Sequence, residues 1–360
     1  MSIADIAKNI HECNENIILI YAFNATGKTR LSVEYKDLTK SLNKGKHVGV
    51  YYNAFSEDLF YWDNDEKNQG FQKKMIIVPS NLNSLHSLLT EDAIKEKLFP
   101  YNPSYNFFFN SFRDTTDFES ITFFKAGKED VPIKISRGEE RIFIWCFFLA
   151  LFEVEGWADV QNQHIIIDDP VSSLDDHNIF ITASSIFELV EQHFEKRKII
   201  ITTHHMGLFT ILQDWLTKGE KAAKFRLEDK ARTPKYRLCI LESKENVVNL
   251  KSTKKGVMLY HLRLLQMLDD ASKEPLSFFH FAMLRQTLEV ISSFLGKPYF
   301  GYVLQQIGIA DPDEVAKVIN SHSHRKVYSY QSEVLHESDK AIFDDVLNKL
   351  KTKYNFALHN

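Results

Sequence analysis

Short apolar runs rich in β-branched residues alternate along the chain with longer segments of helical character. Runs of this kind, bounded by polar residues, are typical of buried strands. The predicted strands cover Asn16–Ala22, Lys46–Phe55, Val131–Ile135, Gln163–Ile167 and Lys198–Thr202. The predicted helices cover Thr29–Leu42, Glu139–Phe152 and Asp176–Phe194. The alternation predicts an α/β fold with parallel strand pairs.

This pattern defines a first domain over residues 1–250. Residues 66–130 are rich in Asn, Phe and Asp with no clean period, so we expect an insertion whose fold the pattern does not assign. Beyond a boundary near 244–256 the pattern becomes helical and aromatic, which predicts a small, mainly α-helical domain over 257–360. No long heptad segment interrupts the chain, so we expect no coiled coil.

Composition limits the compartment and the kind of partner. The net charge of −4 does not mark the whole chain as a polyanion binder, so any nucleic-acid surface would be local. Three scattered cysteines predict neither a disulfide framework nor structural zinc. The longest apolar run, near Ile142–Phe152, is shorter than the roughly 20 residues of a membrane span. We therefore expect a cytoplasmic protein that contacts no membrane.

A glycine–lysine–threonine loop follows the first predicted strand. Residues Ala22–Thr29 read A-F-N-A-T-G-K-T. A phosphate loop needs a tight turn that points backbone N–H groups at the ligand from the start of a helix. Gly27 would supply the turn, Lys28 would reach the β- and γ-phosphates, and the Thr29 hydroxyl would bind Mg²⁺. Together with Asn24, they form the predicted nucleotide-binding loop, although so short a match also occurs in ordinary strand–turn–helix units.

Two aspartates end the predicted strand over 163–167. A buried strand that ends in a carboxylate suits a magnesium site, so Asp168 would hold Mg²⁺. Asp169 would then orient or deprotonate the attacking water. The alternative is that the two acids only end a strand and begin a loop.

Three further motifs stand in a fixed order around these aspartates. Ser136–Glu140 read S-R-G-E-E before a helix, Pro170–Asp175 read P-V-S-S-L-D, and Thr202–His204 end the next strand with T-T-H. With the phosphate loop, this order resembles ABC-type ATPases of the SMC/Rad50 branch. The resemblance implies an ABC-type ATPase head that forms a nucleotide-sandwich dimer.

The same resemblance implies roles for four residues. Ser136, Gly138 and Glu139 of one subunit would contact the γ-phosphate held by the other. His204 would sense or stabilise that phosphate within its own subunit. A hydroxyl and N–H groups at a helix start suit an anion.

The nucleotide motifs depart from the usual pattern of this class. Alanine replaces glycine at Ala22 and Ala25, so the loop needs backbone angles there that alanine can adopt. Most members have glutamate where this chain has Asp169, which is one methylene shorter and predicts slow hydrolysis. A nucleotide-sensing regulatory subunit with weak turnover is therefore one alternative function.

A more specific resemblance covers nearly the whole chain. Tyr51–Asp65 read Y-Y-N-A-F-S-E-D-L-F-Y-W-D-N-D, an aromatic–acidic box similar to the one that marks PrrC-type tRNA anticodon nucleases. The phosphate loop, the motifs described above and Y-H-L-R-L-L at Tyr260–Leu265 resemble the same family. In that family the box is thought to help the ATPase recognise nucleotide identity. From physical chemistry alone, it would be a core segment with a solvated acidic edge.

The resemblance implies a nuclease site in the C-terminal domain. Arg285 and Glu289 share one face of a predicted helix, where a structural ion pair is the ordinary interpretation. Metal-free RNA cleavage needs a base for the 2′-OH, an acid for the leaving oxygen and a cation for the phosphorane charge. The family's R-x-x-x-E and N-x-x-S-H patterns match Arg285, Glu289 and His324, with His322 as the competing histidine.

By this resemblance the protein is a latent antiphage toxin that cuts a tRNA anticodon, typically that of a lysine tRNA. Its cofactors would be ATP or GTP, with a deoxynucleotide as a further candidate regulator, and Mg²⁺. Its partners would be tRNA, a second copy or higher homo-oligomer, and a type I restriction–modification complex that silences it. The alternative is a coiled-coil-less SMC-like ATPase in DNA repair or defence without nuclease activity.

Overall fold

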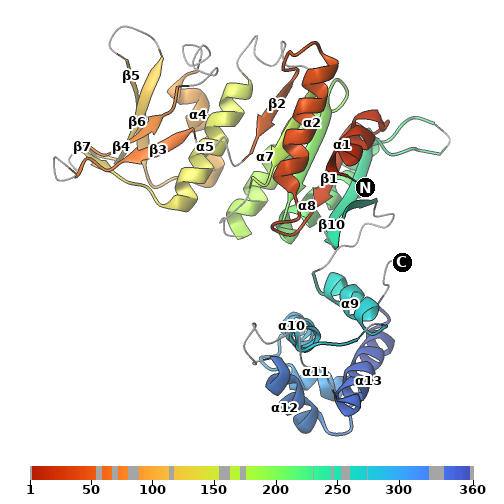
Figure 1. Cartoon of the computed structure of the whole chain (residues 1–360). Helices are drawn as coiled ribbons and strands as arrows, with labels where there is room; N and C mark the ends of the chain where they lie inside the picture. Colours follow the sequence, from red (N-terminus) through yellow and green to blue (C-terminus); the bar gives the residue numbers. More distant parts are fainter. Residues whose placement is uncertain are drawn as a thin grey trace. The chain divides into compact units, whose positions relative to one another are not determined.

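The computed structural model describes residues 2–53, 59–66, 72–79, 89–112, 117–153, 163–170, 176–229, 231–244, 247–252, 260–273, 275–323 and 336–356. The chain divides into two compact units, Met1–Gly256 and Val257–Asn360 (Figure 1). The first is α/β and the second is helical, which confirms the predicted fold class. No helix in the described residues is both long and apolar enough to cross a membrane.

A six-stranded sheet forms the centre of the first unit. Its strands are β1 (Ile17–Tyr21), β2 (Gly49–Tyr52), β8 (His164–Asp168), β9 (Lys198–Thr203), β10 (Tyr236–Lys244) and β11 (Val247–Ser252). The spatial order is β11-β10-β1-β9-β8-β2, and every pair is parallel except β10 with β11. Four of these strands were predicted. Strands β1 and β8 are buried throughout and β9 at every residue but Lys198, as expected of parallel strands covered on both faces.

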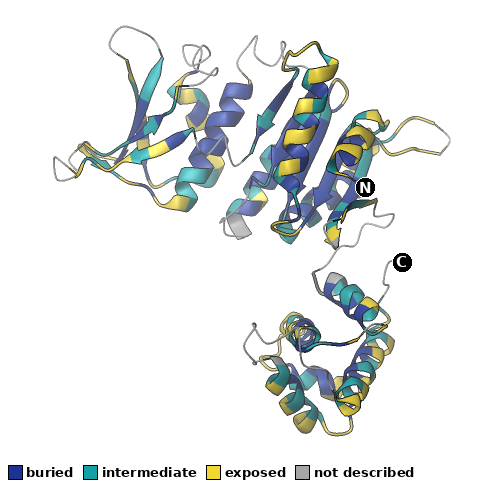
Figure 2. Ribbon diagram, in the orientation of Figure 1, coloured by how far each residue is buried: buried dark blue, intermediate teal, exposed yellow. Residues whose placement is uncertain are grey.

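Helices cover both faces of this sheet. The helices of the first unit are α1 (Ile3–Glu12), α2 (Lys28–Leu42), α4 (Glu91–Leu98), α5 (Arg137–Phe152), α7 (Asp176–His193) and α8 (Met206–Thr217), with the 3₁₀ turns η3 (Phe99–Tyr101) and η4 (Glu220–Phe225). On one face, α1 and α2 share a core with alternate residues of the strands, among them Ile18, Ile166 and Ile200. Helix α8 contacts β1 and β9 and packs against α7. Figure 2 shows the resulting buried layer.

A second sheet covers the region predicted as an insertion over 66–130 and extends beyond it at both ends. Its strands are β3 (Phe60–Asp63), β4 (Lys74–Ile77), β5 (Asn106–Ser111), β6 (Phe118–Lys125) and β7 (Lys128–Ile133). They pair antiparallel in the order β3-β4-β6-β5, with β7 also on β6. The predicted strand over 131–135 thus belongs to this sheet. Phe107 and Phe123 each pack edge-on to Phe143 of α5 at 4.9 Å, which explains the phenylalanine content of the segment.

Helix α5 joins the two sheets. Phe143 faces the second sheet, whereas Trp145 packs on Tyr52 of β2 and donates its indole N–H to Ser185 of α7. Every residue from Ile142 to Phe152 is buried, because elements surround this part of the helix. The predicted apolar helix therefore connects the two sheets of the first unit.

The second unit is a helical domain with its own core. Its helices are α9 (Tyr260–Ala271), α10 (Phe278–Phe294), α11 (Gly301–Gln306), α12 (Pro312–Ser323) and α13 (Glu337–Tyr354). Helix α10 is central and contacts the other four. Phe281 and Phe343 are fully buried in the core with Leu284, Leu288 and Val303.

Candidate functional site

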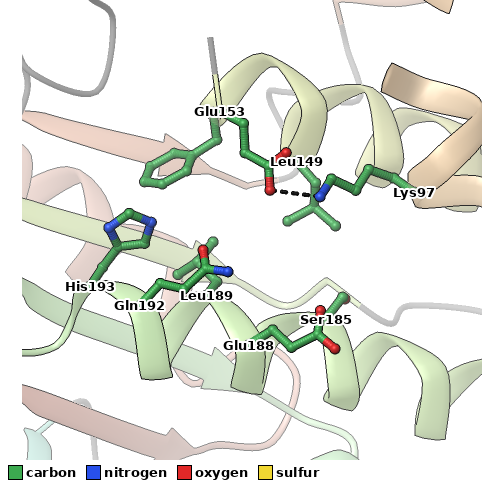
Figure 3. Close-up of a pocket in the computed structure, with 9 residues that line it drawn as sticks. Lys97, Leu149, Glu153, Ser185, Glu188, Leu189, Gln192 and His193 are labelled. Carbon is green, nitrogen blue, oxygen red and sulfur yellow. Dashed lines mark hydrogen bonds and ion pairs between the residues drawn. The ribbon is translucent and has the colours of Figure 1, made fainter. Parts of the chain in front are cut away.

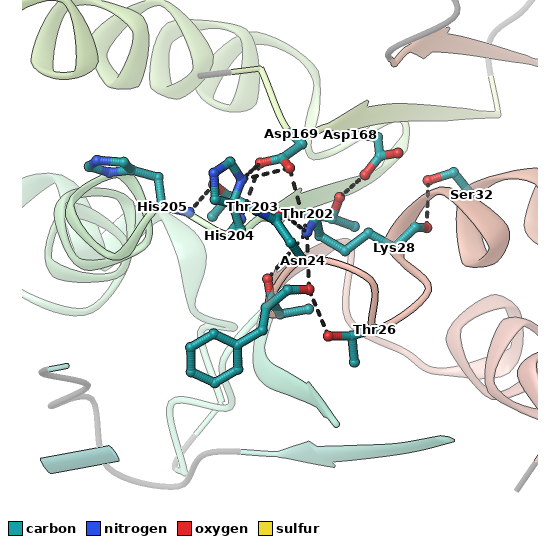
Figure 4. Close-up of polar contacts among 12 residues, drawn as sticks. Asn24, Thr26, Lys28, Ser32, Asp168, Asp169, Thr202, Thr203, His204 and His205 are labelled. Carbon is teal, nitrogen blue, oxygen red and sulfur yellow. Dashed lines mark hydrogen bonds and ion pairs between the residues drawn. The ribbon is translucent and has the colours of Figure 1, made fainter. Parts of the chain in front are cut away.

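The predicted nucleotide residues meet at one edge of the central sheet. Strands β1, β9 and β8 are parallel neighbours, so the segments that follow them leave the sheet at the same edge. The phosphate loop follows β1, Asp168 ends β8, and His204 follows β9. Figure 4 shows Lys28 in contact with Asn24 and Asp169, His204 beside Asp169, and Asp168 beside Thr202. Residues 171–175, which include the S-L-D motif, lie outside the described residues.

The phosphate loop turns through two residues in the left-handed region. Gly27 is the N-cap of α2 with φ 107°, a conformation that glycine adopts without steric cost. Ala25 has φ 62°, so alanine does occupy a left-handed angle at a position where glycine is usual. The small left-handed region allowed to L-residues includes this angle, at a cost of roughly 1–2 kcal/mol. The Thr26 hydroxyl donates to the Phe23 carbonyl at 2.6 Å and braces the turn.

Lys28 lies at the centre of the site. Its side chain is 7% exposed, and its ammonium contacts the carbonyls of Ala22 and Phe23, both at 3.3 Å, and Oδ1 of Asn24 at 3.4 Å. The nearest described carboxylate oxygen is Oδ2 of Asp169, at 3.5 Å. A buried ammonium with weak, long contacts is available to a phosphate.

Asp168 is a buried carboxylate with hydroxyl partners. It is 2% exposed, and it accepts hydrogen bonds from the hydroxyls of Thr202 and Thr29. Burial raises the pKa of Asp168, an effect that these hydrogen bonds and Lys28 only partly offset. A carboxylate and a threonine hydroxyl are ligands that Mg²⁺ accepts, and a cation would offset the burial of the charge. The residues present therefore fit a magnesium ion.

Asp169 links Lys28 to His204. Its carboxylate lies 2.6 and 2.7 Å from Nδ1 of His204 and accepts the His204 backbone N–H at 3.1 Å. Burial acts to raise the pKa of Asp169, but the His204 hydrogen bonds and the Lys28 charge outweigh it and hold the pKa below its usual value. Asp169 thus stays ionised, as an acceptor for a water proton must. Its own backbone has φ 58°, a left-handed angle that turns the chain after β8.

The predicted trans motif begins helix α5. Ser136 is exposed and caps the helix: its hydroxyl accepts the Glu139 N–H at 3.3 Å, and Glu139 accepts the Ser136 N–H at 2.9 Å. Ser104 adds a hydrogen bond to Glu139 at 3.1 Å. Gly138 lies in the first turn between them. The described hydrogen bonds of Ser136 are thus local to this helix start, whereas Glu139 is also held by Ser104, and Ser136 and Arg137 are exposed to solvent.

The predicted nuclease pair lies on α10. Nε of Arg285 is 2.8 Å from Oε1 of Glu289, and their side chains are 26% and 47% exposed. This contact fits a surface ion pair as well as an active-site pair. The pair differs from other surface ion pairs of this unit in its position, because α10 contacts each of the other four helices.

The two candidate histidines differ in what the structure describes. The His322 ring packs against Phe278 at 5.0 Å and Phe281 at 4.9 Å, and Nε2 lies 3.4 Å from Asp339 of α13. His322 is thus held among helices, and its contacts place the last turn of α12 against the turn of α10 that precedes Arg285. His324 lies outside the described residues.

Candidate base-stacking aromatics in this unit separate clearly by exposure. Phe278 and Phe281 are core residues at 5% and 0% exposure, whereas Phe279 and Tyr299 are 53% and 78% exposed. Of these four, only Phe279 and Tyr299 expose a ring to which a splayed base has access.

A small cavity lies between α5 and α7, away from the phosphate loop (Figure 3). It measures about 50 Å³, and the Lys97–Glu153 ion pair (2.6 Å), Ser185, Glu188 and His193 line it. Ligand pockets are typically some 300–1,000 Å³. The cavity is therefore too small for a nucleotide.

Two contacts of the site had no signal in the sequence. Thr202 was part of the T-T-H motif without a role, yet its hydroxyl is a direct partner of Asp168. Ser104 lies in a segment that the sequence left unassigned, yet it holds Glu139. Both partners come from distant parts of the chain, and neither position shows a pattern by itself.

A curated protein and a protein-family model match this chain. The chain is 31% identical to the anticodon nuclease of Escherichia coli over 377 aligned residues, which cover 94% of this chain and 89% of that protein. The model of an AAA domain matches residues 119–348.

Two solved structures of SMC ATPases show low similarity to this chain. A structure of the SmcHead bound to the C-winged helix domain of ScpA matches at 11% identity and a TM-score of 0.36, over 66% of this chain and 90% of that one. A structure from work on ATP-driven dimerization and DNA-stimulated activation of SMC ATPases matches at 13% identity and 0.31, over 54% and 96%. Both TM-scores are too low to indicate shared function.

Proposed function

Because the chain belongs to the anticodon nuclease family, we propose that it is a tRNA endoribonuclease controlled by its own ATPase domain. The observation that carries the proposal is the convergence of Lys28, Asp168, Asp169 and His204 at one sheet edge. A second domain carries Arg285 and Glu289 in direct contact. A tRNA nuclease controlled by an ATPase domain requires both a nucleotide site and a nuclease site.

The first domain would bind and hydrolyse ATP or GTP. Lys28 would hold the β- and γ-phosphates, and Thr29 and Asp168 would hold Mg²⁺, which would neutralise phosphate charge. Asp169 would accept a proton from the attacking water, and its hydrogen bond to His204 would fix the direction of the carboxylate. The phosphate would replace Asp169 as the partner of Lys28.

The second domain would cut RNA without metal. Glu289 and His324 would serve as general base and general acid for the ribose 2′-OH and the leaving 5′-oxygen. Arg285 would stabilise the charge on the phosphorane. The products would be a 2′,3′-cyclic phosphate and a 5′-hydroxyl, and exposed Phe279 and Tyr299 are available to stack on anticodon bases.

Nucleotide would act as the switch. Two copies would close on shared nucleotides, with Ser136, Gly138 and Glu139 of each contacting the γ-phosphate bound by the other. The exposed helix start at Ser136 suits such a contact, since its hydroxyl can still donate a proton and the N-terminus of α5 attracts anions. We further propose lysine tRNA as substrate, a deoxynucleotide as a candidate regulator, and a type I restriction–modification complex as the silencing partner in antiphage defence.

The test is cleavage of bulk tRNA by the full-length protein with Mg²⁺ and ATP or GTP, followed by sequencing of the cut ends. We expect one cut in one anticodon loop, absent in Glu289→Ala and in His324→Ala. Lys28→Ala should abolish nucleotide hydrolysis and reduce cleavage. His322→Ala, with a stability measurement alongside, decides between the two histidines.

Intact tRNA with every nucleotide, while hydrolysis continues, would contradict the nuclease proposal. It would favour the SMC-like ATPase instead, for which the Arg285–Glu289 contact would be an ordinary surface ion pair. Tight nucleotide binding with negligible turnover would favour a regulatory subunit.

A further inference from the structure

The aromatic–acidic box at Tyr51–Asp65 contacts the start of α5 on both sides of Ser136. On one side, the Trp62 indole N–H donates to Oε2 of Glu140 at 2.9 Å. On the other, Nζ of Lys134 donates to Oδ1 of Asn64 at 3.0 Å. The Lys134 ammonium also lies 5.4 Å from the centre of the Trp62 ring.

Other box residues continue along the same helix. Tyr52 packs edge-on to Trp145 at 4.9 Å, and Phe60 packs edge-on to Phe147 at 5.3 Å. The described part of the box therefore contacts α5 from its first turn to its third. Residues 54–58 of the box lie outside the described residues.

We propose that Trp62 and Asn64 are positioning residues that hold the segment Lys134–Glu140 in place for its contact with nucleotide on a second copy. This inference rests on the proposed function, because it assigns a task to the segment that would contact the γ-phosphate in trans. It gives the box a mechanical role in the nucleotide-driven closure of two heads.

The local bonds of this segment do not fix its direction by themselves. The Ser136–Glu139 capping box shapes the first turn of α5, but both of its members belong to that turn. Ser136 itself is exposed. A contact that must meet a ligand on another copy tolerates little misplacement, so bonds to a neighbouring strand are needed on each side.

The chemistry of the contact between Trp62 and Glu140 suits this task. The indole donates only one hydrogen bond, and its acceptor Glu140 is a carboxylate, so the bond is charge-assisted and directional. Trp62 is itself fixed by β3, paired with Met75 of β4, and by the ring of Phe123 at 5.6 Å. The second sheet thus supplies a rigid support.

The test compares Trp62→Phe with Tyr61→Phe in full-length protein. Trp62→Phe keeps an aromatic ring and removes the N–H donor, whereas Tyr61 is its 55%-exposed neighbour on the same strand and serves as control. Three quantities are measured: affinity of the protomer for a fluorescent ATP analogue, dimer formation with Mg-ATP by sedimentation, and the hydrolysis rate.

We expect Trp62→Phe to bind nucleotide within about twofold of the parent, since Lys28 and Asp168 are unchanged. Dimer formation and hydrolysis should fall about three- to tenfold, in line with loss of one partly exposed hydrogen bond to a charged group. Glu140→Ala should have a similar effect, and the double variant should be no worse than the worse single. Tyr61→Phe should match the parent.

Unchanged dimer formation in Trp62→Phe, or losses that add in the double variant, would refute the positioning role. A parallel weakening of nucleotide affinity would also refute it, because it would indicate general damage to the fold. The variant Ser136→Ala tests the proposed trans contact separately from the positioning role of Trp62. If Ser136→Ala leaves dimer formation unchanged, the proposed contact with the γ-phosphate in trans is wrong, and so is the positioning role of Trp62. If Ser136→Ala reduces dimer formation but Trp62→Phe does not, only the positioning role is wrong.

Discussion

His164 shows how a single residue can be held entirely by partners from elsewhere in the chain. It begins β8 and is 1% exposed. Nε2 shares a hydrogen bond with the Tyr51 hydroxyl, and the ring packs edge-on to Tyr35 at 5.1 Å. A Cβ at Gly49 would lie 1.9 Å from Nε2, so only glycine fits on the neighbouring strand. Burial, with a small contribution from His11, lowers the pKa of His164 to about 4.

This depressed pKa predicts a specific acid sensitivity. The unfolded chain would bind the proton near pH 6.5 and the folded chain only near pH 4, so the stabilisation is full above pH 6.5 and is lost as pH falls toward 4. Between pH 7.5 and pH 5 His164 should account for about 2 kcal/mol of lost unfolding free energy. Urea titrations of the parent and His164→Leu at the two pH values measure it.

Tyr51→Phe is the matched control, because it removes the hydrogen bond and leaves the imidazole. Its pH dependence should stay close to that of the parent. An equal pH dependence in the parent and His164→Leu would show that other groups cause the acid sensitivity.

Helix α10 carries both core residues and the proposed nuclease pair. Phe281, Leu284 and Leu288 are buried and form the core of the second unit, while Arg285 and Glu289 are partly exposed on the same helix. If Arg285 and Glu289 are catalytic, a helix packed on four neighbours gives their side chains a fixed support. The spacing of four residues is equally that of an ordinary stabilising pair.

Stability and activity distinguish these interpretations. Arg285→Ala and Glu289→Ala should each lower the free energy of unfolding by no more than about 1 kcal/mol, because the pair is partly exposed. Both should abolish tRNA cleavage. The control is Asp345→Ala, which removes the Asp345–Lys349 pair of the same spacing and the same 2.8 Å distance on α13. It should have the same small effect on stability and none on cleavage; equal loss of cleavage in all three would indicate a structural role.

The whole molecule consists of two units with separate hydrophobic cores. The proposed nucleotide residues all belong to Met1–Gly256, and the proposed nuclease pair belongs to Val257–Asn360. A ligand stabilises only the cooperative unit that contains its site. A ligand of the first unit should therefore leave the unfolding of the second unit unchanged.

Calorimetry should resolve two transitions, and Mg-ATP should raise the temperature of one of them. At a hundred times the dissociation constant the gain is about 2.7 kcal/mol, or some 5–10 °C for a unit of this size. Lys28→Ala should abolish the shift without moving the other transition. A single transition that shifts as a whole would show that the two units unfold together.

The sequence by itself determined the parts of this protein that depend on local pattern. The alternation of apolar strands and helices gave β1, β8, β9, α5 and α7 close to their observed bounds, because burial on both faces of a parallel sheet imposes that pattern on the chain. The phosphate loop was recognisable because its chemistry uses adjacent residues.

Contacts between residues that lie far apart in the sequence were decided by the tertiary structure alone. Strand β10 lies beside β1, yet the basic, polar stretch over 220–237 that leads into it and the 219-residue separation from Ile17 to Tyr236 gave no sign of it. The ion pair of Asp169 with Lys28, the hydroxyl of Thr202 on Asp168 and the bond from Trp62 to Glu140 likewise join separate segments. Periodicity reports which face of an element is buried, whereas the partner on that face is set by how the whole chain packs.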